Sequence, residues 1–268
     1  MNDEPDGGCS TVQGLVRGPG RQRTLPAASL SDALRRHIAA TWAFRRQEEL
    51  DAGARFVRLG VSLEQLEAPE PLILLARRAA EDERRHAGMC ELMARTYGHE
   101  DGEPLSSAPR VEEAGPPELG FRERVLYEVV ATCCLAETES TAGLTSVLSV
   151  DGPPRVRAVL RDILRDEVAH SRLGWAYLGH AAKEGSVAFL ARYVPAMLED
   201  CMTPRLFAQG LDEADGSRLM AHGVLPSARK VEVFIQALHD VVFPSLERCG
   251  VDTSHALRWA ERRRASGA

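Results

Sequence analysis

Two short motifs of the chain pair a glutamate with a histidine three residues later. They are Glu83 and His86 in ERRH, and Glu167 and His170 in EVAH. Residues three apart in a helix lie on one face about one turn apart, so each pair can offer a carboxylate and an imidazole to one point. Taken singly, either motif is better explained as part of a solvated helix face.

Apolar neighbours favour a core position for both motifs. The residues that share the helix face of Glu83 are Leu72, Ala76, Ala79, Cys90 and Met93. Those that share the face of Glu167 are Leu160, Ile163, Leu164 and Gly174. A glutamate and a histidine within such an apolar stripe are expected to point into the protein.

Two further glutamates interrupt apolar stripes. Glu137 is in line with Cys133 and Thr141. Glu49 lies seven residues after Trp42 and seven before Phe56, a spacing that returns to nearly the same helix face. Its neighbour Glu48 is the competing choice for this position.

The spacing places the glutamates at matched heights. Glu49 and Glu83 are each 17 residues from Leu66, and Glu137 and Glu167 are each 15 residues from Gly152. If helices turn at these midpoints, each antiparallel pair sets its two glutamates side by side. Four buried carboxylates without partners would cost several kcal/mol each, so a pair of divalent cations is expected. Oxygen and imidazole donors suit iron or manganese.

The elements that must position these residues are predicted to be helices. Four long ones are expected, from Ser31 and Asp32 to about residue 60, from 71 to about 97, from 121 to about 150 and from 155 to about 183. Shorter helices are expected near 186–200, 227–247 and 253–265. No strand pattern is found. Residues 1–29, rich in Gly, Pro and polar side chains, are predicted to form a disordered tail.

Connection lengths predict the topology. Short linkers join the first helix to the second and the third to the fourth, so each pair is expected to be antiparallel. About 23 residues separate the pairs, which at roughly 3.3 Å per residue can run the length of a bundle. Residues 30–183 are therefore predicted to form an all-α four-helix bundle with one long crossover. Residues 184–268 are expected to be a helical extension packed on the bundle or a homodimer surface.

The order Glu, ExxH, Glu, ExxH resembles the ferritin-like diiron-carboxylate superfamily over about residues 35–182. The stretches AAEDERRHAGMC, CLAETES and LRDEVAHSRLGWAYL are similar to a bacterial branch of ferritin-like domain proteins. The resemblance implies a ferritin-like four-helix bundle with extra C-terminal helices and a pair of bridging ligands, Glu83 and Glu167. It implies these metal ligands: Glu49, Glu83, His86, Glu137, Glu167 and His170.

A second likeness is to the bacterial multicomponent monooxygenases. Asp82 and Asp166 precede the motif glutamates where those enzymes place an aspartate that orients a ligand histidine. Arg85 matches their arginine before the first ligand histidine, and Ala169 departs from it at the second. Thr141 occupies the position of an active-site threonine. The alternatives are surface aspartates and a core threonine that hydrogen-bonds its own helix.

Other positions depart from related families. Ile163 stands where the arylamine N-oxygenases carry a third histidine, and no rubredoxin domain is found. Tyr177, seven residues after His170, is expected to be a packed core residue, with a place beside a pocket or a radical role as alternatives.

The resemblance implies a non-haem diiron oxidase or oxygenase that uses O2 to oxidise a small organic substrate by hydroxylation, N-oxygenation or desaturation. Its cofactors would be two iron ions or a manganese–iron pair, and an external protein would supply electrons. The alternatives are a ferroxidase or peroxide scavenger, and a non-catalytic helical protein with a structural metal. A cavity lined by Trp42, Cys133, Thr141 and Tyr177 would favour the oxygenase.

Composition excludes several other classes. The net charge is −6 and no basic tract occurs, so nucleic acid is not an expected partner. The acidic N-terminus lacks the basic and apolar segments of a signal peptide, and no stretch approaches the roughly 20 apolar residues of a membrane helix. Six cysteines without a CxxC pair predict a cytoplasmic protein rather than a zinc ribbon.

Overall fold

The computed structural model describes residues 30–99, 109, 115–201 and 215–265, and all regular structure within them is helical. This agrees with the predicted all-α class. The predicted tail at residues 1–29 lies outside the described residues. Four long helical segments form the bundle: α1 (Asp32–Gln65), α2 (Glu70–Thr96), the run of α3 (Phe121–Val129), η2 (Val130–Ala136) and α4 (Glu137–Leu148), and α5 (Pro154–Glu184).

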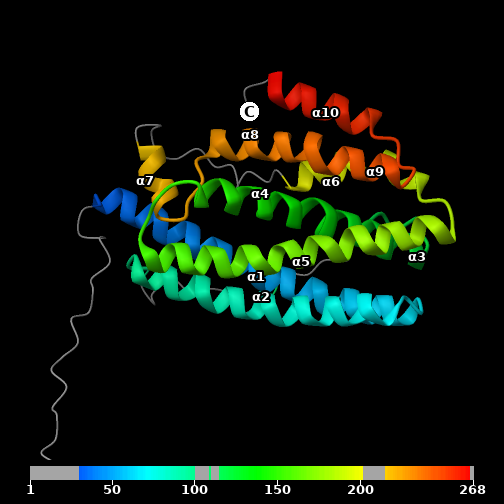
Figure 1. The fold of residues 1–268 in the computed structure, drawn as a ribbon, viewed down its shortest axis with the longest axis horizontal. Helices are drawn as coiled ribbons and strands as arrows, with labels where there is room; N and C mark the ends of the chain where they lie inside the picture. The colour runs from blue at the N-terminus through cyan, green and yellow to red at the C-terminus, as the bar shows by residue number, and fades with distance from the viewer. Residues whose placement is uncertain (1–29, 100–108, 110–114, 202–214, 266–268) are drawn as a thin grey trace, which may run out of the picture.

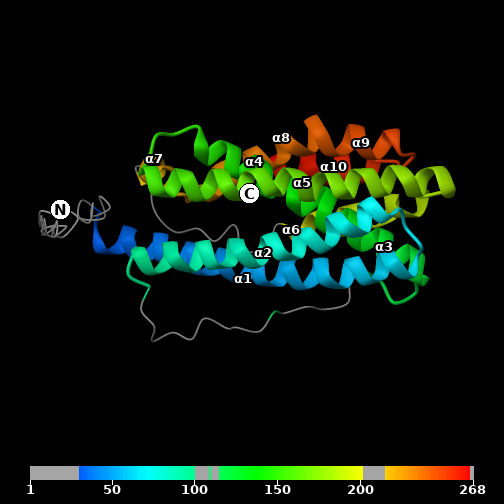
Figure 2. The same cartoon turned by 60° about the horizontal axis from the view of Figure 1, so that its bottom comes forward.

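These segments pack as two antiparallel pairs (Figure 1). Helix α1 packs along α2, α4 packs along α5, and the pairs meet where α2 contacts α5 and α1 contacts α3. Helix α2 ends at one end of the bundle and α3 begins at the other, as both views show (Figure 2). The end of α2 and the start of α3, which are consecutive helices of the two pairs, therefore lie at opposite ends of the bundle.

The remaining helices lie on the α4 side of the bundle (Figure 1). Helix α8 packs on α4, and α10 packs on α6 and α8. These elements are η3 (Ala188–Arg192), α6 (Val194–Cys201), α7 (Gly216–Ala221), α8 (Ser227–Ala237), η5 (Leu238–Val242), α9 (Phe243–Arg248) and α10 (Ser254–Ala265). No helix among the described residues is both long and apolar enough to cross a membrane.

Helix α1 continues past Gly60, where the sequence had predicted its end, to Gln65. Gly60 faces α2, because a Cβ atom there would lie 3.4 Å from the Arg77 side chain and 3.8 Å from that of Ala76. The glycine permits close packing within a continuous helix. The turn to α2 is consequently only four residues long, and Glu67 within it has a positive φ of 53°.

The core of the bundle consists of two hydrophobic clusters. We call the one that contains Phe56, Leu173 and Tyr177 the large cluster, and the one that contains Trp42 and Ile163 the small cluster. On α1 the switch between clusters falls between Trp42 and Phe56, and on α5 it falls between Ile163 and Leu173. A layer of different chemistry must therefore occupy this level of the bundle.

A π-helical segment, η2, leads directly into Glu137. Gly174 of α5 packs against it, since an added Cβ atom would lie only 2.6 Å from Cβ of Cys133 and 2.9 Å from Sγ of Cys134. The missing side chain at Gly174 therefore sets how closely η2 and α5 approach each other.

Replacing Gly174 with alanine is expected to destabilise the protein by about 1–3 kcal/mol, because the added methyl group overpacks a tight contact. Gly179→Ala, in the same helix, is the matched control. No atom lies within 4 Å of a Cβ there, so the lower backbone entropy of alanine should stabilise by about 0.5–1 kcal/mol. Urea unfolding followed by circular dichroism measures both changes. Equal effects of the two substitutions would contradict the packing argument.

Candidate metal centre

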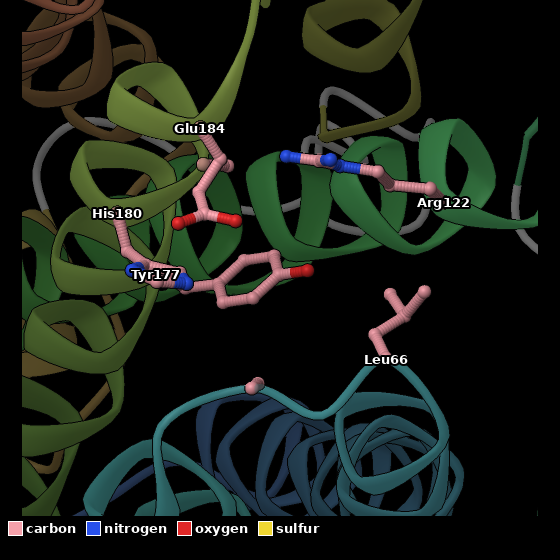
Figure 3. Close-up of a pocket in the computed structure, with 7 residues that line it drawn as sticks. Leu66, Arg122, Tyr177, His180 and Glu184 are labelled. Carbon is pink, nitrogen blue, oxygen red and sulfur yellow. The ribbon is translucent and has the colours of Figure 1, made fainter.

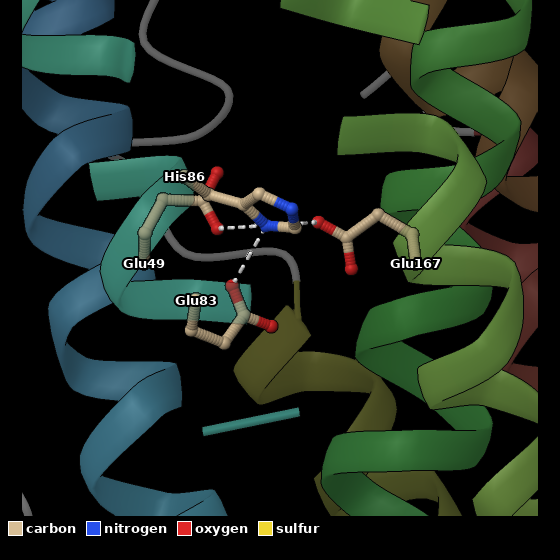
Figure 4. Close-up of side chains that lie close together, drawn as sticks. All are labelled: Glu49, Glu83, His86 and Glu167. Atoms are coloured by element: carbon tan, nitrogen blue, oxygen red, sulfur yellow. Dashed lines mark hydrogen bonds and ion pairs between the residues drawn. The ribbon is translucent and has the colours of Figure 1, made fainter. Parts of the chain in front are cut away.

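The layer between the two hydrophobic clusters contains two overlapping groups of buried carboxylates and histidines that could hold metal ions. The first group is Glu49, Glu83, His86 and Glu167 (Figure 4). The second is Glu83, Glu137, Glu167 and His170. Within each group the potential ligand atoms lie within 4.8 Å of one another. The structure thus brings together all six residues that were predicted as ligands.

Glu83 and Glu167 belong to both groups because each directs one carboxylate oxygen toward each histidine. Oε2 of Glu83 lies 3.3 Å from Nδ1 of His86, and Oε1 lies 3.1 Å from Nδ1 of His170. The corresponding distances from Glu167 are 3.7 Å from Oε1 to His86 and 3.3 Å from Oε2 to His170. This is the arrangement that a pair of carboxylates shared by two ions requires.

Glu49 and Glu137 each belong to only one of the two groups. Oε2 of Glu49 lies 3.8 Å from Nδ1 of His86. One turn later in α1, Gly53 allows the close approach of α2, because a Cβ there would lie 3.3 Å from Cβ of Glu83. Glu48 belongs to neither group. Glu137 is the first residue of α4 and is buried.

Behind the carboxylates, each histidine faces the aspartate of the opposite motif. Nε2 of His86 lies 3.2 Å from Oδ2 of Asp166, and Nε2 of His170 lies 3.7 Å from Oδ2 of Asp82. Arg85 joins the two halves, since its NH2 group donates to Asp82 at 2.8 Å and to Asp166 at 2.5 Å. Both imidazoles consequently turn Nδ1 toward the glutamates.

Sequence reasoning did not identify Arg165. Its Nε donates to Oδ1 of Asp166 at 3.2 Å, and its side chain is 65% exposed. Arg165 thus provides positive charge beside Asp166, in addition to that of Arg85. No sequence signal distinguished it from the other surface arginines.

Protons balance the charges when the site holds no metal. Burial, together with the neighbouring Glu83 carboxylate, raises the pKa of Glu49 well above its ordinary value, and burial and Glu167 do the same for the pKa of Glu137. Although burial opposes it, hydrogen bonds to the glutamates raise the pKa of His86 to about 11 and that of His170 to about 10. The carboxyl groups of Glu49 and Glu137 are thus protonated and neutral, and the imidazoles of His86 and His170 are cations.

The donor set fits iron or manganese. Its atoms are carboxylate oxygens and imidazole nitrogens, which are ligands for these metals. Sγ of Cys90 lies 3.9 Å from Oε1 of Glu49, and burial raises the pKa of this thiol well above its usual value. Cys90 belongs to neither group of potential ligands.

Thr141 lies one turn after Glu137 in α4. Its Oγ1 atom is buried and has no hydrogen-bond partner among the residues that the structure describes. The alternative, a hydrogen bond to its own helix, is therefore not formed, and the hydroxyl hydrogen stays available.

Trp42, Cys133, Thr141 and Tyr177, whose common cavity would favour an oxygenase, are not gathered in one hydrophobic cluster. Trp42 belongs to the small cluster and donates from Nε1 to the backbone oxygen of His222 at 3.1 Å. Cys133 and Tyr177 belong to the large cluster. The two aromatic side chains therefore lie on opposite sides of the charged layer.

In comparisons with known proteins, no family model, curated protein or solved structure matches the chain.

Proposed function

We propose that this chain is a ferritin-like diiron protein that uses O2 to oxidise a small organic molecule. The observation that carries the proposal is the sharing of Glu83 and Glu167 by two buried groups, each completed by its own glutamate and histidine. Two antiparallel helix pairs, with the end of α2 and the start of α3 at opposite ends of the bundle, support a ferritin-like connection. A metal pair in such a site supplies the electrons that reduce O2.

The residues of the site would have separate roles in holding the metal ions. Glu49 and His86 would hold one ion, Glu137 and His170 the other, and the two shared glutamates would neutralise both. Asp166 accepts from Nε2 of His86 and so keeps its Nδ1 free for a metal, a role that outer-shell carboxylates commonly perform.

Arg85 would position these aspartates and would not contact the metals, because it holds Asp82 and Asp166 beside the two imidazoles. The unpaired hydroxyl of Thr141 favours an oxygenase, because a proton donor would stand one turn from a ligand. The described residues contain no reductase module, so we propose that an external donor supplies electrons.

A ferroxidase or peroxide scavenger is the second candidate. It is favoured by the separation of Trp42 and Tyr177 into different clusters, because a substrate pocket of an oxygenase is expected to bring these side chains together. In that case iron or peroxide would itself be the substrate.

Anaerobic titration with Fe(II), followed by exposure to O2 and by optical and Mössbauer spectroscopy, is expected to show about two iron ions per chain that O2 oxidises as a pair. Further Fe(II) distinguishes the candidates. An oxygenase should stop after the resident pair is oxidised and resume only with a reductant, whereas a ferroxidase should continue to oxidise added iron. One zinc ion per chain and no uptake of iron would contradict both.

A further inference from the structure

A second cluster of chemically active side chains lies at the end of the bundle, away from the candidate metal centre. A pocket of about 130 Å³ opens there between the α1–α2 turn, the start of α3 and the end of α5 (Figure 3). The residues that line it are Leu66, Ala68, Arg122, Tyr177, His180, Ala181 and Glu184. Tyr177 follows His170 by seven residues of one helix, which is about 10.5 Å at 1.5 Å per residue. The pocket is therefore separate from the metal ligands.

Two opposite charges in this pocket do not neutralise each other. Arg122 projects from α3 and Glu184 from α5 toward the same space (Figure 3). No ion pair or hydrogen bond joins either side chain to any residue that the structure describes. Other surface charges of the chain pair readily, as Arg77 does with Glu64 at 2.8 Å. Both charged groups therefore face the pocket without a charged partner among the described residues.

The hydroxyl group of Tyr177 is directed into the same pocket and also lacks a partner among the described residues. The side chain is buried, with 4% of its surface exposed, and its hydroxyl points into the pocket (Figure 3). No hydrogen bond from this hydroxyl to another described residue is formed. Burial raises the pKa of Tyr177, so the group stays a neutral donor. The His180 ring lies beside it, with centroids 6.3 Å apart.

From this arrangement we propose that the pocket binds a small zwitterion, a molecule of amino-acid size with one carboxylate and one ammonium group. Arg122 would receive the carboxylate, since guanidinium is the preferred partner of that group. The hydroxyl of Tyr177 would donate a second hydrogen bond to it, and Glu184 would receive the ammonium group. Leu66, Ala68 and Ala181 offer apolar contact to the carbon atoms between the two charges.

Calorimetric titration of the full-length, metal-loaded chain tests the proposal with glycine, β-alanine and 4-aminobutanoate, which differ in the spacing of their charges. At least one should bind at millimolar concentration, and about tenfold or more tightly than acetate or methylammonium, because both charges are then paired. Arg122→Gln and Glu184→Gln should each weaken binding about tenfold or more, and Tyr177→Phe about fivefold, the loss expected for one neutral hydrogen bond.

Arg155→Gln is the matched control, because Arg155 is also exposed on α5 but does not line the pocket. Its affinity should equal that of the unchanged protein. The substituted side chains at 122 and 184 are exposed, so unchanged melting temperatures will show that these variants fold. Absence of binding by all three zwitterions, equal binding of acetate alone, or affinities unaffected by Arg122→Gln and Glu184→Gln would each overturn the proposal. None of these outcomes depends on metal chemistry.

Discussion

Truncation of Glu83 or Glu167 to alanine is expected to abolish metal binding almost completely. Each of these carboxylates belongs to both groups, so its loss removes a ligand from both positions. It also leaves two cations to be neutralised by three carboxylates in a buried layer, where unbalanced charge is costly. Iron content, measured by elemental analysis after anaerobic loading, should fall from about two ions per chain to nearly none.

Variants of the unshared glutamates provide the contrast. Glu49→Ala should retain one of the two ions, because only the group that contains His86 loses a ligand. Glu48→Ala is the matched control and should load normally, since Glu48 belongs to neither group. Circular dichroism should show that all variants stay helical. Normal metal content in Glu83→Ala would contradict the proposed ligand set. So would a loss of metal in Glu48→Ala if Glu49→Ala loses no metal.

The choice of Glu49 over Glu48 could be made from the sequence because helix geometry is regular. Residues seven apart return to one face, and Trp42, Glu49 and Phe56 are all buried. The height of the glutamates along the bundle could also be predicted, because the two helices of an antiparallel pair have the same rise per residue. The turn occupies residues 66–69, close to the expected midpoint at Leu66. An error of one or two residues displaces a level by only about 1.5–3 Å.

Features that depend on how helices pack could not be predicted. The sequence places an aspartate before each motif glutamate, but the pairing of Asp166 with His86 across the bundle depends on how α2 and α5 are rotated about their axes. The π-helical segment before Glu137 has no local sequence signal, and the close contact that it makes with Gly174 joins two different helical segments. The pocket at Tyr177 requires three segments that are distant in the sequence.

Metal binding is expected to stabilise the fold strongly without being needed to form it. The two hydrophobic clusters supply a core on either side of the charged layer, so the metal-free chain should remain helical. A ligand that binds only the folded state adds about 4 kcal/mol at a free concentration a thousand times its Kd. For a chain of this size that corresponds to an increase in Tm of roughly 8–16 °C. Thermal melts with and without a chelator, followed by circular dichroism, measure the difference.

The size of this stabilisation should depend on pH, with a sign fixed by the pKa shifts of the metal-free site. The pKa values of Glu49 and Glu137 are raised, so these groups favour the folded state below their ordinary value of 4.5 and lose that contribution as the pH rises through their folded values. His86, whose pKa is raised to about 11, likewise contributes fully below 6.5 and less as the pH approaches 11. The metal-free protein is therefore expected to lose stability from mildly acidic to alkaline solution.

Metal ions compete with these same protons, because carboxylate and imidazole must be deprotonated to act as ligands. The gap in Tm between the iron-loaded and chelated protein should therefore be small at about pH 5 and larger at about pH 8. Parallel melts at the two pH values, under anaerobic conditions, provide the measurement. A gap that shrinks as the pH rises would show that the buried glutamates and histidines are not the metal ligands. Complete loss of helix on chelation at either pH would show instead that the two hydrophobic clusters cannot sustain the bundle and that metal drives its folding.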